Sequence, residues 1–204
     1  MNLFTETALL SLFLGIGLSA SAGFRVFLPL FLISFLAWQD QNLMELTTEM
    51  HWLSNPVVVV VFGLAALVEI GIYYIPFLDN KLDKLKIPFA CIAGVILVKS
   101  TMLIDNNVIA WLVALIIGGG IAGLVSYSIA VARKITSTTT NGDGNFLVNT
   151  AEIVGALLLS ITAIIFSPLA VVITAILIYL MIKSLSRIKD GTSENLRNLT
   201  VNVE

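Results

Sequence analysis

Four ionisable side chains lie within long apolar stretches of the sequence: Arg25, Glu69, Lys99 and Glu152. A charged side chain at membrane depth is energetically unfavourable, so such residues usually face the protein interior, where they are paired or hydrated. These four residues could therefore carry chemistry, and we treat them as candidates for a substrate or ion path.

Glu69 lies in the apolar stretch 67–71 and has no polar neighbour in the sequence. A carboxyl group in such a stretch indicates a cation or proton route. The alternative is a structural ion pair with Arg25 or Lys99 that only fastens helices together. Arg25 itself follows the small residues of 19–23, where a loosened helix would expose backbone groups to a cavity. It could contact an anion there, pair with Glu69, or extend its apolar stem so that its charged group reaches the membrane interface. For Lys99 we expect the last of these.

Glu152 ends the stretch Asn149-Thr150-Ala151-Glu152, which has the form of a helix N-cap followed by an acid at the third helical position. The first interpretation is therefore a capping carboxylate. The second makes Glu152 another carboxylate of a cation or proton path.

Asp79 and Asp83 stand four residues apart and would share one helical face. Together with Glu69 they offer three carboxylates, which are ligands that hard divalent cations prefer. A metal site here would use Glu69, Asp79 and Asp83. The interleaved lysines favour the alternative, a solvated linker over residues 76–87 that lies on an anionic leaflet.

Two glycine-containing segments complete the candidates. The hydroxyl-rich loop 136–145 contains Asn141, Gly142 and Gly144 and leads into a helix start, so it could hold an anion or a lipid headgroup. A plain flexible loop is the alternative. The run 118–120 with Gly123 is typical of close helix packing, although it could also unwind at a substrate.

The composition restricts the class of protein. The chain has 204 residues, 58% hydrophobic and 12% charged, with a mean hydropathy of +0.99. A water-soluble domain of this size could not cover so much apolar surface. One cysteine and one histidine exclude a disulfide framework, a thiolate zinc site and a Cys/His catalytic pair. The net charge of −2 provides no basic surface for nucleic acid, and we expect no cofactor.

The elements that must position these residues are membrane-spanning helices, because about 20 apolar residues cross a bilayer core. We predict an all-α integral membrane protein with about six spans, a first helix broken near residues 19–23, and a single transmembrane domain over residues 1–186. A cytoplasmic polar tail would follow at 187–204. The last two runs could be two full spans or a re-entrant hairpin. The runs are roughly 3–38, 57–75, 88–104, 108–133, 150–166 and 169–186.

Basic residues predict the orientation. Lys and Arg gather in the linker 76–87, in the segment 133–149 and in the tail, whereas the loop 39–56 has none. Cytoplasmic loops carry such an excess, so six spans would place both termini in the cytoplasm of a bacterial inner membrane.

A faint internal repeat relates residues 3–104 to residues 108–186. Three features recur in the same order, and three spans per unit would invert the second copy, as in many secondary transporters. Ala22-Gly23, Glu69 and Pro88-Phe89-Ala90 correspond to Ala122-Gly123, Glu152 and Pro168-Leu169-Ala170.

Three motifs together resemble the DUF4126 family, a bacterial family of polytopic membrane proteins defined as a domain of unknown function. They lie at 19–29, at 69–83 and at 138–152, and the resemblance covers roughly residues 5–185. It implies a small inner-membrane protein with several spans and implies no particular substrate.

The sequence favours a small transporter or channel-like permease, cation or proton linked, with Glu69, Asp79 and Asp83 on the route. The partners of such a protein would be membrane lipids and a small ion or solute. The glycine run 118–120 is compatible with a homo-oligomer. The alternative is a non-transporting membrane scaffold or assembly factor. A lipid-modifying enzyme would use Arg25 with Gly142 and Gly144, but the chain shows no nucleophile and base pair, so we expect no enzyme.

Overall fold

The long apolar run at the start of the chain forms two helices, α1 (Glu6–Phe24) and α2 (Phe27–Gln39). The computed structural model describes residues 6–40, 44–72, 76–104, 106–140 and 145–201, and in 76–84, 137–140, 145–146 and 187–201 it describes the backbone alone. These residues contain helices and no strand, which confirms the all-α prediction. The other elements are η1 (Thr48–Ser54), α3 (Pro56–Ile72), α4 (Pro76–Thr101), α5 (Asn107–Val113), the π-helical η2 (Ala114–Gly119), α6 (Gly120–Thr140), α7 (Asn145–Ile165) and α8 (Ser167–Val201).

The chain reverses direction between α1 and α2. Near the start of α1, the hydroxyl of Ser11 accepts a hydrogen bond from the backbone N–H of Leu103, just beyond the end of α4. Just after the end of α1, the side chain of Arg25 donates to the carbonyl of Asn149, near the start of α7. Beyond α2, the backbone N–H of Thr47 donates to Ser100 O at 2.9 Å, so the chain has returned to the end of the bundle where α4 ends. The run 3–38, which we counted as one span, is thus two helices, and its two ends lie at the same end of the bundle.

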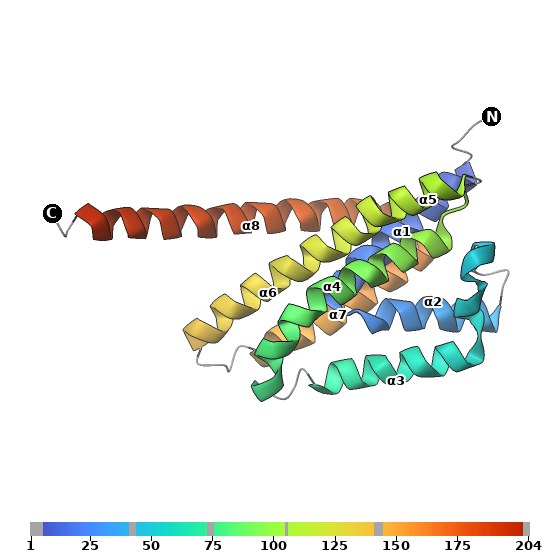
Figure 1. Cartoon of the computed structure of the whole chain (residues 1–204), viewed down its shortest axis with the longest axis horizontal. Coiled ribbons are helices and arrows are strands. Elements are labelled where there is room, and N and C mark those ends of the chain that lie inside the picture. Colours follow the sequence, from blue (N-terminus) through green and yellow to red (C-terminus); the bar gives the residue numbers. More distant parts are fainter. Residues whose placement is uncertain (1–5, 41–43, 73–75, 105, 141–144, 202–204) are drawn as a thin grey trace.

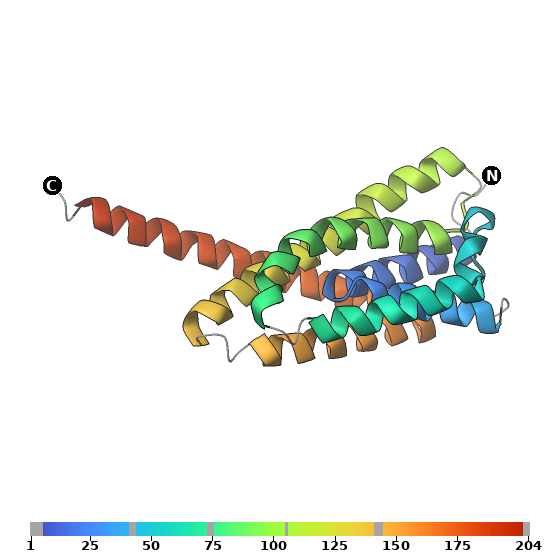
Figure 2. The same cartoon turned by 60° about the horizontal axis from the view of Figure 1, so that its bottom comes forward.

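The break itself lies at residues 25–26, two residues beyond the predicted 19–23. The small residues 19–23 stay helical because they pack rather than unwind. Ser19 Oγ donates to Gly118 O at 2.6 Å, and Ser21 Oγ donates to Ala156 O at 2.8 Å. Small residues of this kind let helix backbones approach closely in membranes. As a result α1 lies at the centre of the bundle, in contact with α4, α6, α7 and α8 (Figures 1 and 2).

The glycines at the α4–η2 crossing pack closely. A side chain on Gly94 would collide with the backbone of Gly118, and one on Gly118 would collide with Gly94, whereas a Cβ on Gly120 would meet nothing within 4 Å. Gly118 therefore serves helix packing, as the spacing of the run favours, whereas Gly120 is not needed for it.

The repeat is not confirmed. Its small-residue motifs do meet, because a Cβ on Gly23 would collide with Val125 and the carbonyl of Ala122. The proline motifs differ locally, since Pro88 lies inside α4 and Pro168 in the first turn of α8.

Among the residues that the structure describes, four helices are long and apolar enough to cross a membrane: α1, the α5–η2–α6 helix, α7 and the first 20 residues of α8. The pair η1 and α3, bent by 66°, would be a fifth. The predicted count of six is not confirmed, because α2 has only 13 residues and the apolar stretch of α4 between Lys86 and Lys99 is too short to cross a bilayer core. Because α7 and the apolar part of α8 are each long enough to cross a membrane, their lengths favour two spans over a re-entrant hairpin.

Helices also occupy segments that the sequence assigned to loops. The predicted linker 76–87 is part of α4, and the predicted loop at 133–149 is largely helical, because α6 continues to Thr140 and α7 begins at Asn145. The polar tail likewise continues α8 as helix to Val201. At the ends that we predicted to be cytoplasmic, the helices thus continue beyond their last apolar residues.

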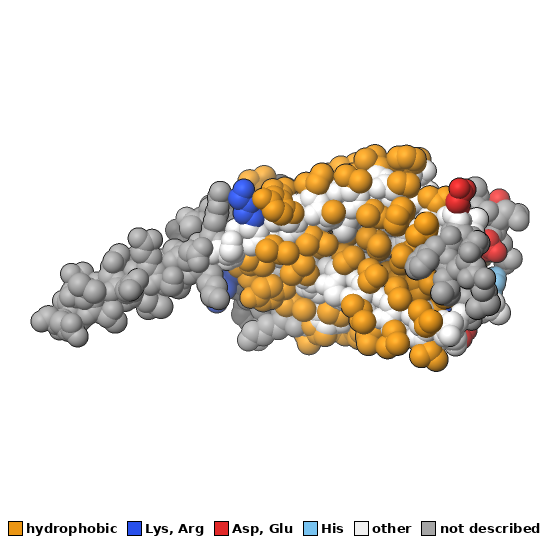
Figure 3. Space-filling model, turned by 90° about the horizontal axis from the view of Figure 1, so that it is seen from above, with side chains coloured by type: hydrophobic (Ala, Val, Ile, Leu, Met, Phe, Trp, Pro, Cys, Tyr) orange, Lys and Arg blue, Asp and Glu red, His pale blue; other side chains and the backbone are white. Residues whose placement is uncertain are grey.

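The surface has the pattern of a membrane protein. Figure 3 shows a broad apolar surface on one face of the bundle, with acidic side chains at one end and basic side chains at the other. Exposed Glu45 and Glu49 belong to the end at which α1 begins, and exposed Lys134 and Lys183 belong to the opposite end, from which α8 extends (Figure 1). The start of α1 and the end of α8 lie at opposite ends of the bundle (Figure 1), so the prediction that both termini are cytoplasmic is not confirmed.

Candidate functional site

A helix begins inside the bundle at the break after α1. An α-helix of 13 residues is about 20 Å long, whereas a bilayer core is about 30 Å thick, so α2 cannot span it. Since its C-terminal end is at the η1 side, its first residues would lie within the hydrocarbon core of the membrane. Their free N–H groups have no water to bind there and need partners within the protein.

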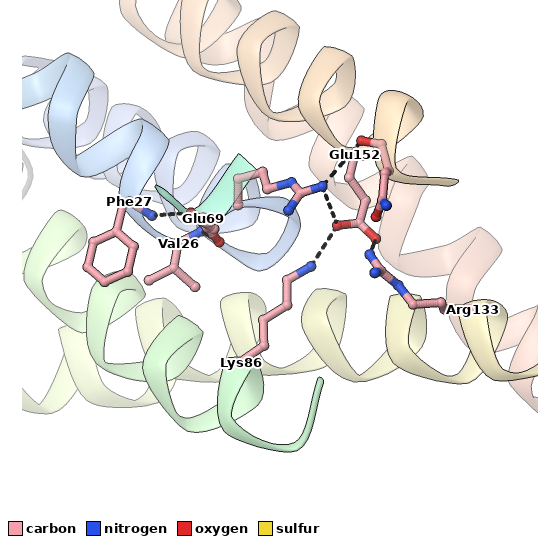
Figure 4. A network of polar contacts seen from close by, with 8 residues as sticks. Val26, Phe27, Glu69, Lys86, Arg133 and Glu152 are labelled. Atoms are coloured by element: carbon pink, nitrogen blue, oxygen red, sulfur yellow. Dashed lines mark hydrogen bonds and ion pairs between the residues drawn. The ribbon is translucent and has the colours of Figure 1, made fainter. Parts of the chain in front are cut away.

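Glu69, on α3, supplies those partners. Its two carboxylate oxygens accept hydrogen bonds from the N–H of Val26 at 2.9 Å and the N–H of Phe27 at 3.0 Å (Figure 4). Pro29, in the first turn, has no N–H to satisfy. The positive end of the helix dipole further favours a carboxylate at this position. Glu69 thus caps α2 and ties α3 to the break, a role that sequence reasoning missed.

Glu152, on α7, is the centre of a buried ionic cluster. Its carboxylate forms ion pairs with Lys86 of α4 at 2.8 Å, with Arg25 at the break at 3.5 Å, and with Arg133 of α6 (Figure 4). Arg25 also donates to Asn149 O at 3.3 Å. The exposed fraction of all five residues is 5% or less. We call Arg25, Lys86, Arg133 and Glu152 the Glu152 cluster.

The helical repeat brings these residues together. In each of three helices the charged residue continues a buried stripe with steps of three or four residues, the spacing of one helical face. The stripes are Lys86, Ala90, Ala93 and Leu97 in α4; Arg133, Ile129, Ser126 and Ala122 in α6; and Asn149, Glu152, Ala156, Leu159 and Ala163 in α7.

Sequence reasoning missed Lys86 and Arg133 because it counted both as cytoplasmic loop cations. The signal that could have found them is their spacing of three or four residues from the small and apolar residues of these stripes. The capping interpretation of Glu152 is wrong, because α7 begins at Asn145 and Glu152 is well inside it. Arg25 pairs with Glu152, a partner that sequence reasoning did not name for it.

The remaining candidate residues lie away from the Glu152 cluster or outside the described residues. Lys99 lies at the far end of α4, where it pairs with Glu49 at 3.1 Å and stands 5.6 Å from the ring centre of Trp111. The side chains of Asp79 and Asp83 lie outside the described residues, as do Asn141, Gly142 and Gly144. Within the described part of the chain, no three His, Cys, Asp or Glu side chains are grouped as metal ligands would be.

A cavity of about 270 Å³ adjoins both charged features. Glu69 and Lys86 are its ionisable wall residues, and the remaining walls are apolar side chains from the break, α3 and α4. The cavity therefore reaches the helix cap on one side and the Glu152 cluster on the other. The apolar walls are Val26, Phe27, Ala65, Val68, Ile72, Leu85 and Phe89.

The cluster generates a prediction about stability. Glu152→Gln would remove the carboxylate that three buried cations share, so we expect it to lower the free energy of unfolding by about 3 kcal/mol or more. Lys86→Met, of similar length, should cost much less, because Glu152 keeps two cationic partners. Thermal unfolding of both variants in detergent measures the difference. An equal loss of unfolding free energy in the two variants would contradict the central position of Glu152 in the cluster.

The comparisons agree with the sequence motifs. The chain matches the family described as DUF4126, a domain of unknown function, over residues 12–187. Nothing among curated proteins or solved structures matches it. The match covers α2 to α7 completely and most of α1, and it includes all four residues of the Glu152 cluster. Because the matched region is most of the chain, this all-helical membrane protein belongs to the DUF4126 family.

Proposed function

We propose that this protein is a small permease whose substrate enters at the break between α1 and α2. The observation that carries the proposal is the cavity bounded by Glu69 and Lys86, beside a helix that begins at membrane depth. Interrupted helices with ionisable residues at their ends are the usual binding sites of secondary transporters. No chemical step is part of the proposal.

Buried charge supports a permease over a scaffold. A helix bundle that serves only assembly gains little from buried ion pairs, because desolvation offsets their attraction. Here four ionisable side chains converge from the break and three helices, next to a cavity. Ionisable groups that are retained at membrane depth most often mark a substrate or ion pathway.

We also propose that the end bearing Lys134 and Lys183 faces the cytoplasm of a bacterial inner membrane, since basic residues accumulate on that side. The start of α1 then lies on the opposite side. The check is labelling of intact cells with a membrane-impermeant maleimide, after Cys91→Ala. We expect labelling of Glu45→Cys and none of Lys134→Cys; the reverse pattern would overturn the orientation.

The permease proposal is tested by flux into proteoliposomes. The probes are chloride, phosphate and acetate as potassium salts, glycerol, and a fluorescent phospholipid placed in one leaflet. We expect at least one probe to move faster than in protein-free vesicles. Ala65→Trp fills the cavity and should lower that rate about tenfold or more, because the path is blocked.

Leu64→Trp is the matched control, because Leu64 is the preceding residue of α3 and is exposed outside the cavity. It should leave the rate unchanged. If no probe moves above background, or if both tryptophan variants slow the flux equally, the proposal fails and the scaffold alternative gains.

A further inference from the structure

The three tryptophans of the chain all lie at one end of the bundle. Trp38 is in the last turn of α2 and Trp52 is in η1, at the end that bears Glu49 (Figure 1). Trp111, in α5, has its ring centre 5.6 Å from the ammonium of Lys99, which pairs with Glu49 at 3.1 Å. The three tryptophans keep 47%, 45% and 42% of their surface exposed.

The exposed surface changes its character beside these tryptophans. Along each of the three chain segments, the exposed side chains on one side of the tryptophan are polar and the chain continues into apolar helix on the other. Tryptophan is enriched at such a boundary in membrane proteins, because its ring is apolar and its N–H can remain hydrated. The exposed polar residues are Gln39, Glu49, His51, Asn106 and Asn107, and the exposed apolar ones are Val57, Val60, Leu64, Leu112 and Leu115.

The contacts of η1 fix it at this level. Met50 and Leu53 are buried against the bundle, whereas the exposed outer side of η1 is polar apart from Trp52. The pair between Glu49 and Lys99 ties η1 to the last turn of α4. A short helix with one apolar face and one polar face, and with tryptophan between them, is typical of a segment that lies in the plane of the membrane interface.

We propose that the three tryptophans lie in the membrane–water interface at this end of the bundle, and that η1 runs along this interface as an anchor rather than crossing the membrane with α3. The partner of this surface is the headgroup region of the bilayer. The inference does not depend on whether the protein is a permease.

The interface also sets the depth of the break after α1. From Trp38 back to Phe27, α2 extends about 17 Å, so its start lies near the middle of a hydrocarbon core that is about 30 Å thick. Glu69, which caps that start, lies at the same depth.

The test is tryptophan fluorescence of the full chain in phosphatidylcholine vesicles. The quenchers are phosphatidylcholines that carry bromine either close to the headgroup or near the end of the acyl chain, and iodide in the water. We expect the wild-type protein to be quenched more strongly by shallow bromine than by deep bromine, and only weakly by iodide. No substitution is needed, because all three tryptophans lie at the same end.

Two variants measure the depth of the break. Val57 and Leu67 are equally exposed, at 68%, and lie near opposite ends of α3. In a chain whose native tryptophans are replaced by phenylalanine, Val57→Trp should be quenched best by shallow bromine, and Leu67→Trp should lie about 15 Å deeper. If this background fails to fold, each variant is compared with the wild type. Leu67→Trp should then add a component that deep bromine quenches, and Val57→Trp should not.

Three results would overturn the inference. Stronger quenching of the native tryptophans by deep bromine would place this end inside the hydrocarbon core. Strong quenching by iodide without quenching by bromine would place it in water. Equal depths for Val57→Trp and Leu67→Trp would refute the depth of the break. None of these measurements involves flux, so they are separate from the test of the permease.

Discussion

The carboxylate of Glu69 on the N–H groups of Val26 and Phe27 is the contact that the rest of the site depends on. It allows α2 to begin at membrane depth, where a bare helix end would leave polar groups without partners. Because α2 begins there, Arg25 lies in the break rather than at the membrane surface. The cavity is the space that this short helix leaves between α3 and α4.

The Glu152 cluster is the second consequence of the break. Arg25 comes from the end of α1, the central helix, and its guanidinium meets Glu152 of α7 together with cations of α4 and α6. One carboxylate therefore connects the break with three helices that α1 already contacts through small residues. A buried charge network of this kind fixes how the helices meet, whether or not it adds net stability.

Much of the fold could be predicted from sequence, because apolar runs report membrane helices directly. Glu69, Arg25 and Glu152 could also be singled out, since an ionisable residue in an apolar run is conspicuous. The reversal at residues 25–26 could not, because two residues leave no trace in composition. Lys86 and Arg133 lie where a helix leaves the apolar run. A cation there resembles a loop cation until its partner on another helix is known.

The identity of Glu69's partner illustrates the same limit. Side-chain charges are visible in a sequence, so Arg25 and Lys99 were the natural candidates. Unsatisfied backbone N–H groups are invisible until a helix start is located. The partners of Glu69 are thus backbone N–H groups, which every residue except proline carries and which residue type therefore cannot identify.

The most direct measurement is amide hydrogen exchange at Val26 and Phe27, by NMR, in the wild-type protein and in Glu69→Leu. We expect both amides to be protected in the wild type and to exchange about tenfold faster or more in the variant, because a charge-assisted hydrogen bond contributes roughly 1.5–3 kcal/mol. Amides in the middle of α1 should exchange at the same rate in both proteins. Unchanged protection of Val26 and Phe27 in the variant would contradict the account.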